Sequence, residues 1–350
     1  MSTATAPTLS TSGGSGGRGD NGLMLRLLRA REAGIALLIV LVVLVTAVNN
    51  HHFLDASSLQ QLLTGAALIA LLGVGETLVI VTRNVDLSVG SVLGLSAYIV
   101  GDLFKYHHIP TWSGFVIGIG VGVVCGAVNG LVVTALRVPS LVVTLGMLYV
   151  IRGIDGVIVS GDRIDPTSIP TSFTAVGYKN LLGIPWLAII VAVVVAIAGY
   201  AMRSFRASRD LYAIGSNPDA AALAGVPIER RVFTAFLISG ALAGLAGALF
   251  LALHTQIDNS GGLGYELSVV AAVVVGGVAI FGGSGTVVGA ALGAVLLNTI
   301  NQALVAGRIS AFWNQAIAGA LLLVAIAFDR WLSVRVTKQL QSAEGAHREL

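Results

Sequence analysis

The stretch TRNVDLSVGSVLGLSAY, residues 82–98, places an Arg, an Asn and an Asp where a long apolar run should continue. Apolar segments of about 20 residues, the length that crosses about 30 Å of hydrocarbon, recur on both sides of it, from Ile35 to Trp331. The 350-residue chain is 55% hydrophobic and 11% charged, whereas soluble domains carry about 25% charged residues. Transmembrane barrels have short alternating segments instead. The sequence therefore predicts an all-α polytopic membrane protein.

Charge and cysteine content exclude several classes of function. The net charge is +3, but the basic residues lie in the gaps between apolar segments rather than in one patch, so we expect no nucleic-acid partner. Cys125 is the only cysteine and lies inside an apolar run. We therefore predict neither a disulfide framework nor a cysteine metal site. The histidines of the loops do not lead us to predict another metal site.

The two ends of the chain are predicted to be tails. Residues 8–21, TLSTSGGSGGRGDN, are rich in Ser, Thr and Gly, so residues 1–32 are expected to form a disordered cytoplasmic tail. Residues 33–333 are expected to form the transmembrane domain, and residues 334–350 a second cytoplasmic tail. A cleaved signal peptide is an alternative reading of the first apolar run. We favour a first span, because many more follow and no clear small-residue cleavage site is present.

Hydropathy predicts ten transmembrane segments with both termini on one side of the membrane. Basic residues favour cytoplasmic loops, and most of them fall on the side of the termini. Only Lys105, Arg163, Lys179 and Arg308 fall opposite, with Arg152 inside the fifth segment. Both termini are therefore predicted to be cytoplasmic. The segments are 33–49, 59–81, 85–104, 112–136, 140–159, 184–202, 232–255, 265–283, 286–306 and 311–332.

Two long loops remain outside the predicted segments. Residues 160–183 form a polar outer loop that contains Pro166 and Pro170. Residues 203–231 form an inner loop that is too polar to enter lipid. The chain lacks a GxxxxGK[ST] motif, so we do not expect it to bind ATP through a P-loop of its own.

Glycine recurs at every fourth residue in several segments. Such spacing lets helix backbones approach closely in lipid, so tight packing is expected, with a moving interface as the alternative. The second to fifth and the seventh to tenth segments would run in opposite senses, which predicts an inverted repeat. The glycines are Gly114, Gly118, Gly122, Gly126 and Gly130 in the fourth segment, Gly240 and Gly244 in the seventh, and Gly285, Gly289 and Gly293 in the ninth.

Acidic residues interrupt the second and third segments. Asp86 is well placed for the first turn of a helix, where it would cap exposed N–H groups, and Arg83 can extend to the membrane interface. Glu76 lies in the middle of an apolar run, where an isolated carboxylate is expensive and is a functional candidate. A structural pairing and a cavity-facing role are both open for Glu76. Asn84 and Ser88 belong to the same stretch.

Polar side chains also occur near the outer ends of later segments. Arg152 and Asp155 are spaced i, i+3 and are predicted to form an ion pair. Asn298, Asn301 and Gln302 lie in the ninth segment, with Trp313 just beyond it. Amides with an aromatic ring suit a sugar, and amides equally suit hydrogen bonds between helices in lipid. Both interpretations remain open.

The inner loop contains a short predicted helix. Asn217 or Ser216 can cap its N-terminus, Pro218 suits its first position, and Gly225 ends it. Pro227 then prevents continuation. A short helix with a small-residue face on a cytosolic loop can dock into the groove of a partner.

Four motifs occur in the order of a known family. They are TRNVDLSVGSVLGLSAY, RVPSLVVTLGMLYVIRG (residues 137–153), GSNPDAAALAGV (residues 215–226) and VVGGVAIFGGSGTVVGAALGAVLLNTI (residues 274–300). Together they resemble the membrane permease subunit of bacterial ABC importers for monosaccharides, the group with the ribose, xylose, arabinose, rhamnose and autoinducer-2 permeases. The resemblance covers residues 54–331. It implies a type II-like ABC importer fold and location in the bacterial inner membrane.

The resemblance also implies partners and sites. ATP and Mg would bind a separate ATPase subunit, a binding protein outside the cytoplasm would deliver the sugar, and a second permease copy or a paralogue would complete the path. No catalytic residue and no cofactor are expected on this chain. Asp219, Ala220, Ala221 and Gly225 are similar to the Glu-Ala-Ala…Gly coupling motif, with Asp replacing Glu. The candidate coupling residues are Asn217, Pro218, Asp219, Ala220, Ala221 and Gly225, and the candidate path residues are Glu76, Asn84, Asp86, Ser88, Asn298, Asn301, Gln302 and Trp313.

Two alternatives stand beside this reading. One is a permease of the same superfamily for branched-chain amino acids or urea. The other is an ion-coupled secondary transporter with Glu76 and Asp86 at its ion site, against which the long basic inner loop argues. The residues do not identify the sugar, although TRN before VDLS is more similar to the rhamnose and autoinducer-2 permeases than to the ribose type.

Overall fold

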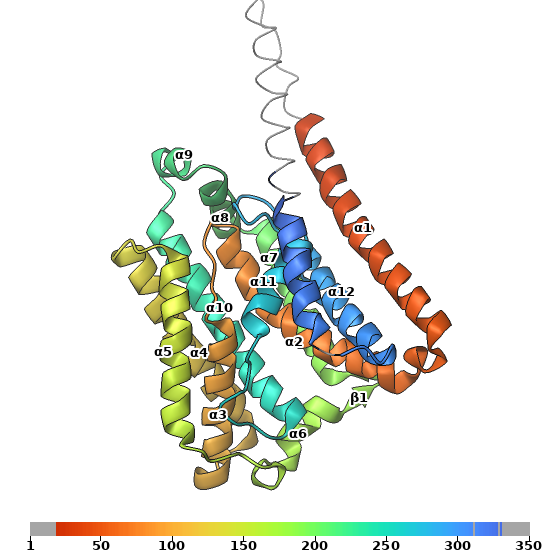
Figure 1. Cartoon of the computed structure of the whole chain (residues 1–350). Helices are drawn as coiled ribbons and strands as arrows, with labels where there is room; N and C mark the ends of the chain where they lie inside the picture. Colours follow the sequence, from red (N-terminus) through yellow and green to blue (C-terminus); the bar gives the residue numbers. More distant parts are fainter. Residues whose placement is uncertain (1–18, 311, 328–329, 331–350) are drawn as a thin grey trace, which may run out of the picture.

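The computed structural model describes residues 19–310, 312–327 and 330, and nearly all of this part of the chain is helical. Figure 1 shows a bundle in which α1 stands at one edge beside α12. The elements are α1 (Gly19–Asn49), η1 (His51–Leu54), α2 (Ala56–Ile80), α3 (Val89–His107), α4 (Thr111–Ala135), α5 (Ser140–Val159), η2 (Pro166–Ser168), α6 (Thr171–Tyr178), β1 (Asn180–Leu181), β2 (Ile184–Pro185), α7 (Trp186–Ser204), α8 (Arg206–Ser216), α9 (Pro218–Leu223), α10 (Ile228–His254), α11 (Tyr265–Val275) and α12 (Val287–Ala306).

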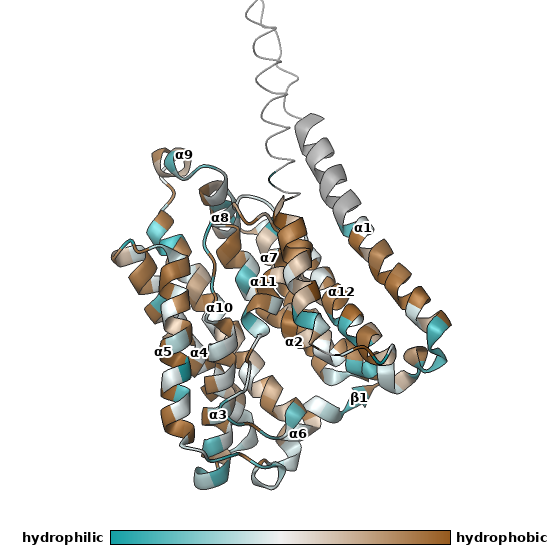
Figure 2. Cartoon of the chain, in the orientation of Figure 1, coloured by the Kyte–Doolittle hydropathy of each residue, from teal (hydrophilic) through white to brown (hydrophobic). Residues whose placement is uncertain are grey.

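In the described part of the chain, seven helices are long and apolar enough to cross a membrane. They lie in α1, α2, α4, α5, α7, α10 and α12. Large hydrophobic side chains are exposed along α1, α5 and α7, and Figure 2 shows that hydrophobic residues predominate in the coloured part of α1 and in α5. The prediction of a polytopic helical membrane protein is confirmed. The count of ten and the inverted repeat stay predictions.

Three predicted segments differ from the observed elements. The predicted span 265–283 is wrong, because α11 ends at Val275 and glycines with positive φ, such as Gly277 at 97°, turn the chain after it. The predicted span 85–104 is the helix α3, which begins only at Val89. The predicted span 311–332 contains a shorter apolar helix, Trp313–Ala327.

The predicted tails are only partly within the described residues. α1 begins at Gly19, so residues 19–32 are helical, and the prediction of a disordered tail is wrong there. Residues 1–18 and the predicted tail 334–350 lie outside the described residues.

The centre of the bundle is formed by α2, α3 and α10. Most residues of α2 from Ala66 to Ile80 are buried, although residues of a lipid-facing helix would be exposed on one side. α10 packs along α2, α3 and α4, and α12 packs along α2. Because α2 is enclosed by neighbours, polar groups on it face protein instead of lipid.

The glycine face of α4 lies against α10, as the spacing predicted for a tight interface. A Cβ added at Gly118 would come 2.8 Å from the carbonyl oxygen of Gly244, and one at Gly240 would come 2.8 Å from Cα of Gly126. Neither position has room for a side chain. In the same way Gly293 of α12 has space only for hydrogen beside the backbone of Ala272 in α11. Tight packing is confirmed for these helices.

Opposite α9, a folded loop closes the other end of the bundle (Figure 1). It contains η2, α6 and the β1–β2 hairpin, in which Leu181 pairs with Ile184. Phe173 of α6 is fully buried against Phe104, with ring centroids 4.8 Å apart. Lys105 binds Asp162 at 2.7 Å, which lowers the pKa of this loop carboxyl. The predicted polar loop 160–183 is therefore a packed cap.

Candidate translocation and coupling sites

A turn between α2 and α3 positions the acidic residues that the sequence singled out. Arg83 has φ 66°, a left-handed conformation that ends α2. The chain then turns so that the Asp86 carboxylate accepts hydrogen bonds from the Ser88 amide at 3.1 Å and from the Ser88 hydroxyl at 2.6 Å. Asp86 thus closes a turn just before α3 instead of lying in its first turn, because α3 begins at Val89.

Side chains from four helices or turns meet at Asp86. The hydroxyl of Ser239 in α10 donates to Asp86 Oδ2 at 3.2 Å. Asn129 in α4 donates to Ser88 Oγ at 2.8 Å. Glu76 Oε1 in α2 accepts the Asp86 amide at 3.1 Å. We call Glu76, Asp86, Ser88, Asn129 and Ser239 the buried polar cluster, since each is at most 1% exposed.

The buried polar cluster carries two carboxyl groups and, among the described residues, no basic side chain pairs with either. Glu76 Oε2 and Asn129 Oδ1 are buried and have no hydrogen-bond partner within that part of the chain. A buried carboxylate without a cation is expensive. The four donors around Asp86 stabilise an anion there, whereas Glu76 has only one. The hydrogen-bond donors are therefore concentrated on Asp86, and Glu76 keeps one buried oxygen without a partner among the described residues.

Arg83 joins the end of α2 to the end of α8. Its Nε donates to the Gly215 carbonyl at 2.6 Å and its Nη2 to the Ser216 carbonyl at 2.8 Å. These carbonyls are among the last of α8, where a cation is favoured by the helix dipole. Gly283 also donates its amide to the Val81 carbonyl at 2.9 Å. Arg83 therefore binds protein, where the sequence had placed it at the membrane interface.

The short helix predicted after α8 is present as α9. Asn217 Oδ1 accepts the Ala220 amide at 3.1 Å, Pro218 occupies the first position, and Gly225 follows the helix with φ 77°. The capping prediction is confirmed for Asn217. Figure 1 shows α9 at the far tip of the bundle, beyond the ends of α4, α5 and α10.

The surface of α9 has one feature that the sequence did not reveal. Ala221 faces inward at 4% exposed, whereas Leu223 is 91% exposed. Leu223 therefore presents nearly its whole apolar side chain at the tip of the inner loop. Asp219 lies in the first turn of the same helix.

The candidate path residues fall into separate groups. Glu76, Asp86 and Ser88 are brought together, whereas Asn84 is turned away and donates to the Thr82 hydroxyl at 3.0 Å. Asn298 is 6% exposed and donates to the Leu62 carbonyl of α2 at 2.7 Å, which is the interhelical role. Leu62 lies 14 residues before Glu76 on α2, which places the two sites about 21 Å apart.

The other candidates follow Asn298 in the chain. Asn301 and Gln302 are half-buried on the last turns of α12, and Trp313 is 59% exposed beyond it. No single pocket therefore contains the whole predicted set, and a role of these residues in the path stays a prediction.

With the geometry established, the chain can be compared with known proteins. Residues 58–326 match the family described as "Branched-chain amino acid transport system / permease component". The chain belongs to this permease family. No solved structure matches it.

Named relatives of the permease are bacterial. The autoinducer 2 import system permease protein LsrC of Enterobacter sp. (strain 638) is 37% identical over 290 residues, which are 83% of each chain. The protein of the same name from Klebsiella pneumoniae is 37% identical over 283 residues, 81% of each chain. That of Escherichia coli (strain K12 / DH10B) is 34% identical over 293 residues, which are 83% of this chain and 84% of the relative. The resemblance to importer permeases is confirmed.

The predicted ion pair between Arg152 and Asp155 of the permease is wrong. Arg152 Nη1 donates to the Gly261 carbonyl at 2.5 Å, and both carboxylate oxygens of Asp155 are buried without a hydrogen-bond partner among the described residues. The guanidinium extends across α3 to the loop before α11, where Gly94 leaves room for it: a Cβ added at Gly94 would lie 3.1 Å from Arg152 Nη1. Sequence spacing showed that the two residues share a face but not that a neighbouring backbone carbonyl competes for the arginine.

At the end opposite α9, the permease has a hollow of about 180 Å³ that the sequence did not reveal. Phe250 and His254 of α10 stack on one side of it, with ring centroids 4.0 Å apart. Asp258 lies in the wall, and hydrogen bonds from the Ser260 hydroxyl and amide lower the pKa of its carboxyl. An aromatic face beside polar groups suits a hydroxylated ligand.

Proposed function

We propose that the chain is the membrane subunit of an ATP-driven importer that carries a small sugar-like molecule across the bacterial inner membrane. The relatives' names make autoinducer 2 the first candidate substrate, and they give no support to rhamnose, the other molecule suggested by TRN before VDLS. A separate ATPase subunit binds ATP and Mg, a binding protein delivers the substrate, and a second permease copy or a paralogue completes the path.

The observation that carries this proposal is α9. This helix of six residues presents Leu223, which is 91% exposed, at the tip of the bundle, where no described residue covers it. The adjoining motif of Asp219, Ala220, Ala221 and Gly225 resembles the coupling motif of importer permeases. We infer that a groove of the ATPase receives Leu223, as grooves receive the apolar anchors of helices.

Hydrogen bonds connect the segment before α9 to the inner end of α2. Arg83 binds the carbonyls of Gly215 and Ser216, just before the Asn217 cap of α9. The chain after Arg83 forms the turn that contains Asp86. A shift of α9 on nucleotide binding would therefore displace the inner ends of α2 and α3, on which the buried polar cluster depends.

The orientation follows from the same assignment. If α9 docks on a cytoplasmic ATPase, both termini are cytoplasmic, as the distribution of basic residues predicts. The hollow beside Phe250 and Asp258 then faces outward and is the entrance where the substrate arrives. Leu182, 97% exposed in the β1–β2 turn, marks the same outer face.

Leu223→Asp tests the coupling, with Leu182→Asp as the matched control. Both replace a leucine that is almost fully exposed, so neither should affect folding. We expect Leu223→Asp to abolish capture of the ATPase and ATP-driven uptake in proteoliposomes, and Leu182→Asp to retain capture. Unchanged capture by the Leu223 variant would contradict the docking assignment.

Two further arms separate the alternatives. Proteoliposomes without the ATPase and the binding protein should take up nothing under a proton or sodium gradient, and uptake there would establish an ion-coupled transporter. When autoinducer 2, a monosaccharide or leucine is added as a competitor of ATP-driven uptake, only the hydroxylated molecules should inhibit.

Cysteine labelling tests the orientation. Maleimide applied to intact cells should label Leu182→Cys and not Leu223→Cys, and the reverse result would invert the orientation.

A further inference from the structure

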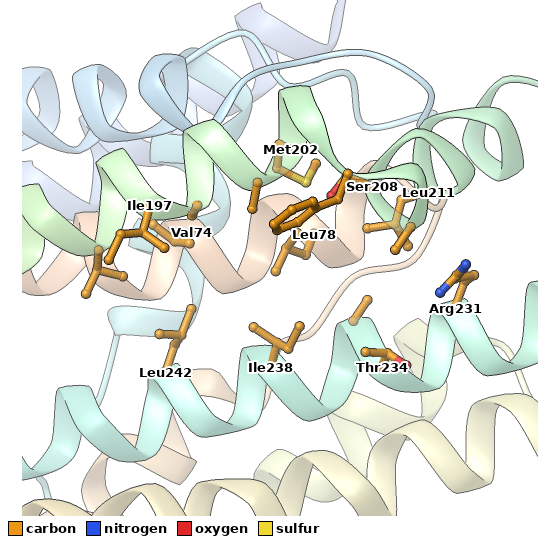
Figure 3. A pocket seen from close by; sticks show the side chains of 16 residues that line it. Val74, Leu78, Ile197, Met202, Ser208, Leu211, Arg231, Thr234, Ile238 and Leu242 are labelled. Atoms are coloured by element: carbon orange, nitrogen blue, oxygen red, sulfur yellow. The ribbon is translucent and has the colours of Figure 1, made fainter.

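A cavity of about 440 Å³ lies between α7 and α10, with α2 as its floor and α8 across one end. Figure 3 shows Ile197 of α7 and Ile238 and Leu242 of α10 on its two sides, with Val74 and Leu78 of α2 behind them. We call this cavity the α7–α10 groove. None of the residues of the buried polar cluster lines it.

The α7–α10 groove opens sideways at the level of the membrane. Ile197 is 63% exposed and Ile238 is 40% exposed, and both lie on helices that are long and apolar enough to cross the bilayer. The occupant of the groove therefore comes from the hydrocarbon, and it must be apolar along most of its length.

The length of the groove matches one leaflet. Its lining on α7 runs from Val194 to Met202, about 12 Å, and on α10 from Arg231 to Leu242, about 16 Å. Half of a 30 Å hydrocarbon core is about 15 Å. A helix with its side chains is 10–12 Å across, so a stretch of about 15 Å occupies more than about 1,000 Å³ and does not fit into 440 Å³, whereas an acyl chain can enter.

Polarity changes from one end of the groove to the other. The polar lining residues, Ser208, Arg231 and Thr234, all lie at the α8 end, and the lining toward Leu242 is apolar (Figure 3). Arg231 is paired with Asp210 at 2.7 Å. An amphiphile whose head is at α8 and whose tail runs along α10 matches this gradient.

Basic and aromatic residues flank the α8 end of the groove in the chain, next to the lining residues Met202, Phe205 and Ser208. Arg203, Arg206 and Arg209 are exposed, and none has a carboxylate partner among the described residues. Tyr200 and Phe205 make an edge-to-face contact, with ring centroids 6.3 Å apart, on the rim. Aromatic rings mark the headgroup level of a membrane, and basic residues beside helices bind anionic lipid heads.

We propose that the α7–α10 groove binds one anionic phospholipid of the leaflet on the α8 side. One acyl chain lies between Ile197 and Ile238, and the phosphate contacts Arg203 and Arg206. The lipid would fill the space between α7 and α10 and hold α8 against the bundle. This inference does not depend on what the permease transports.

The test measures lipid binding by the purified full-length permease. We expect phosphatidylglycerol to raise its melting temperature more than phosphatidylcholine does. Arg203→Gln with Arg206→Gln should weaken the phosphatidylglycerol affinity about 30-fold, since each basic residue near an anionic head contributes about fivefold. Arg137→Gln is the control, because Arg137 is exposed and pairs with Glu229 away from the groove. An equal response of the unmodified permease to both lipids would overturn the proposal.

A second pair of variants tests the chain site. Ala198→Trp fills the groove and should reduce the phospholipid retained in native mass spectra, whereas Ala196→Trp, on the same helix but outside the lining, should not. Equal retention would refute the site.

Protection of an introduced cysteine tests the same site without requiring that the fold accommodate a tryptophan. In a Cys125→Ser background, phosphatidylglycerol should slow maleimide reaction of Ile238→Cys at least fivefold. Unchanged reactivity refutes the lipid. A disulfide between two Ile238→Cys chains would show that a second copy of the permease covers the groove instead.

Discussion

Gly122→Ala should separate α4 from α10, whereas Gly120→Ala in the same helix should not. A Cβ at Gly122 would lie 2.8 Å from the Gly240 carbonyl carbon and from the Gly244 amide nitrogen, and closer still to the Gly240 oxygen. Real Cβ atoms essentially never approach within 3.0 Å. A Cβ at Gly120 would meet nothing within 4 Å.

The magnitude follows from which atoms would have to move. The atoms facing Gly122 are backbone, so the two helices must move apart as rigid bodies. That movement also opens the contacts of Gly118 and Gly126 with α10. Overpacking of this kind typically costs about 1–3 kcal/mol, and we expect the upper end. At Gly120 alanine removes backbone freedom from the unfolded helix and adds up to about 1 kcal/mol of stability. The two variants should differ by about 2–4 kcal/mol.

Cys125 provides the assay. It is the only cysteine of the chain, lies on α4 itself and is 8% exposed. A maleimide dye that becomes fluorescent on reaction therefore reports the exposure of α4 as the purified permease is heated. We expect Gly122→Ala to react at a temperature at least about 5 °C below that of Gly120→Ala. Equal melting temperatures, with both variants monodisperse, would refute the argument from close backbone approach.

Three further outcomes are expected. Glu76→Gln should retain transport and stability because Gln keeps the oxygen that accepts the Asp86 amide, whereas Glu76→Ala leaves that buried amide unbonded and should cost about 1–3 kcal/mol, measured by the same melting assay. Asn298→Leu should lower the melting temperature by removing a buried interhelical hydrogen bond, and Asn301→Leu, at a half-buried position without that bond, should change it less. Asp162→Asn should destabilise the permease at neutral pH. Because Lys105 lowers the folded pKa of this carboxyl, its stabilisation is present above the ordinary pKa of 3.8 and disappears as pH falls through the lowered value, so the melting temperatures of variant and parent should converge below pH 4.

The coarse architecture was predictable because hydropathy is a local property. A run of apolar residues is sufficient to indicate a membrane helix, and the predicted segments 59–81, 112–136, 140–159 and 286–306 agree closely with α2, α4, α5 and α12. The span 265–283 failed for the opposite reason. Its glycines carry no polar side chain and leave the apolar run uninterrupted, yet the positive φ values of Gly277 and the glycines after it prevent the helix from continuing.

The candidate site was predictable only in part. Local chemistry was sufficient for the cap at Asn217, since a side chain and an amide three residues away decide it. It was not sufficient for Arg152, which had Asp155 within reach on its own helix and a carbonyl of a distant loop as a competitor. Asn129 and Ser239, which complete the buried polar cluster, gave no signal, because a single polar residue in an apolar helix is equally consistent with a lipid-side position near the interface.

The sequence by itself determined that this chain is a membrane protein, that α4 has a glycine face without side chains, and that a short capped helix follows α8. Composition and the spacing of residues within one helix are sufficient for these three conclusions. Only the tertiary structure decided that α10 covers this face, that Arg83 reaches Gly215, and that Leu223 stands uncovered. In a membrane, lipid-facing and protein-facing surfaces are both apolar. The partner of each helix is therefore selected by the fit of surfaces far apart in sequence, and hydropathy does not record that fit.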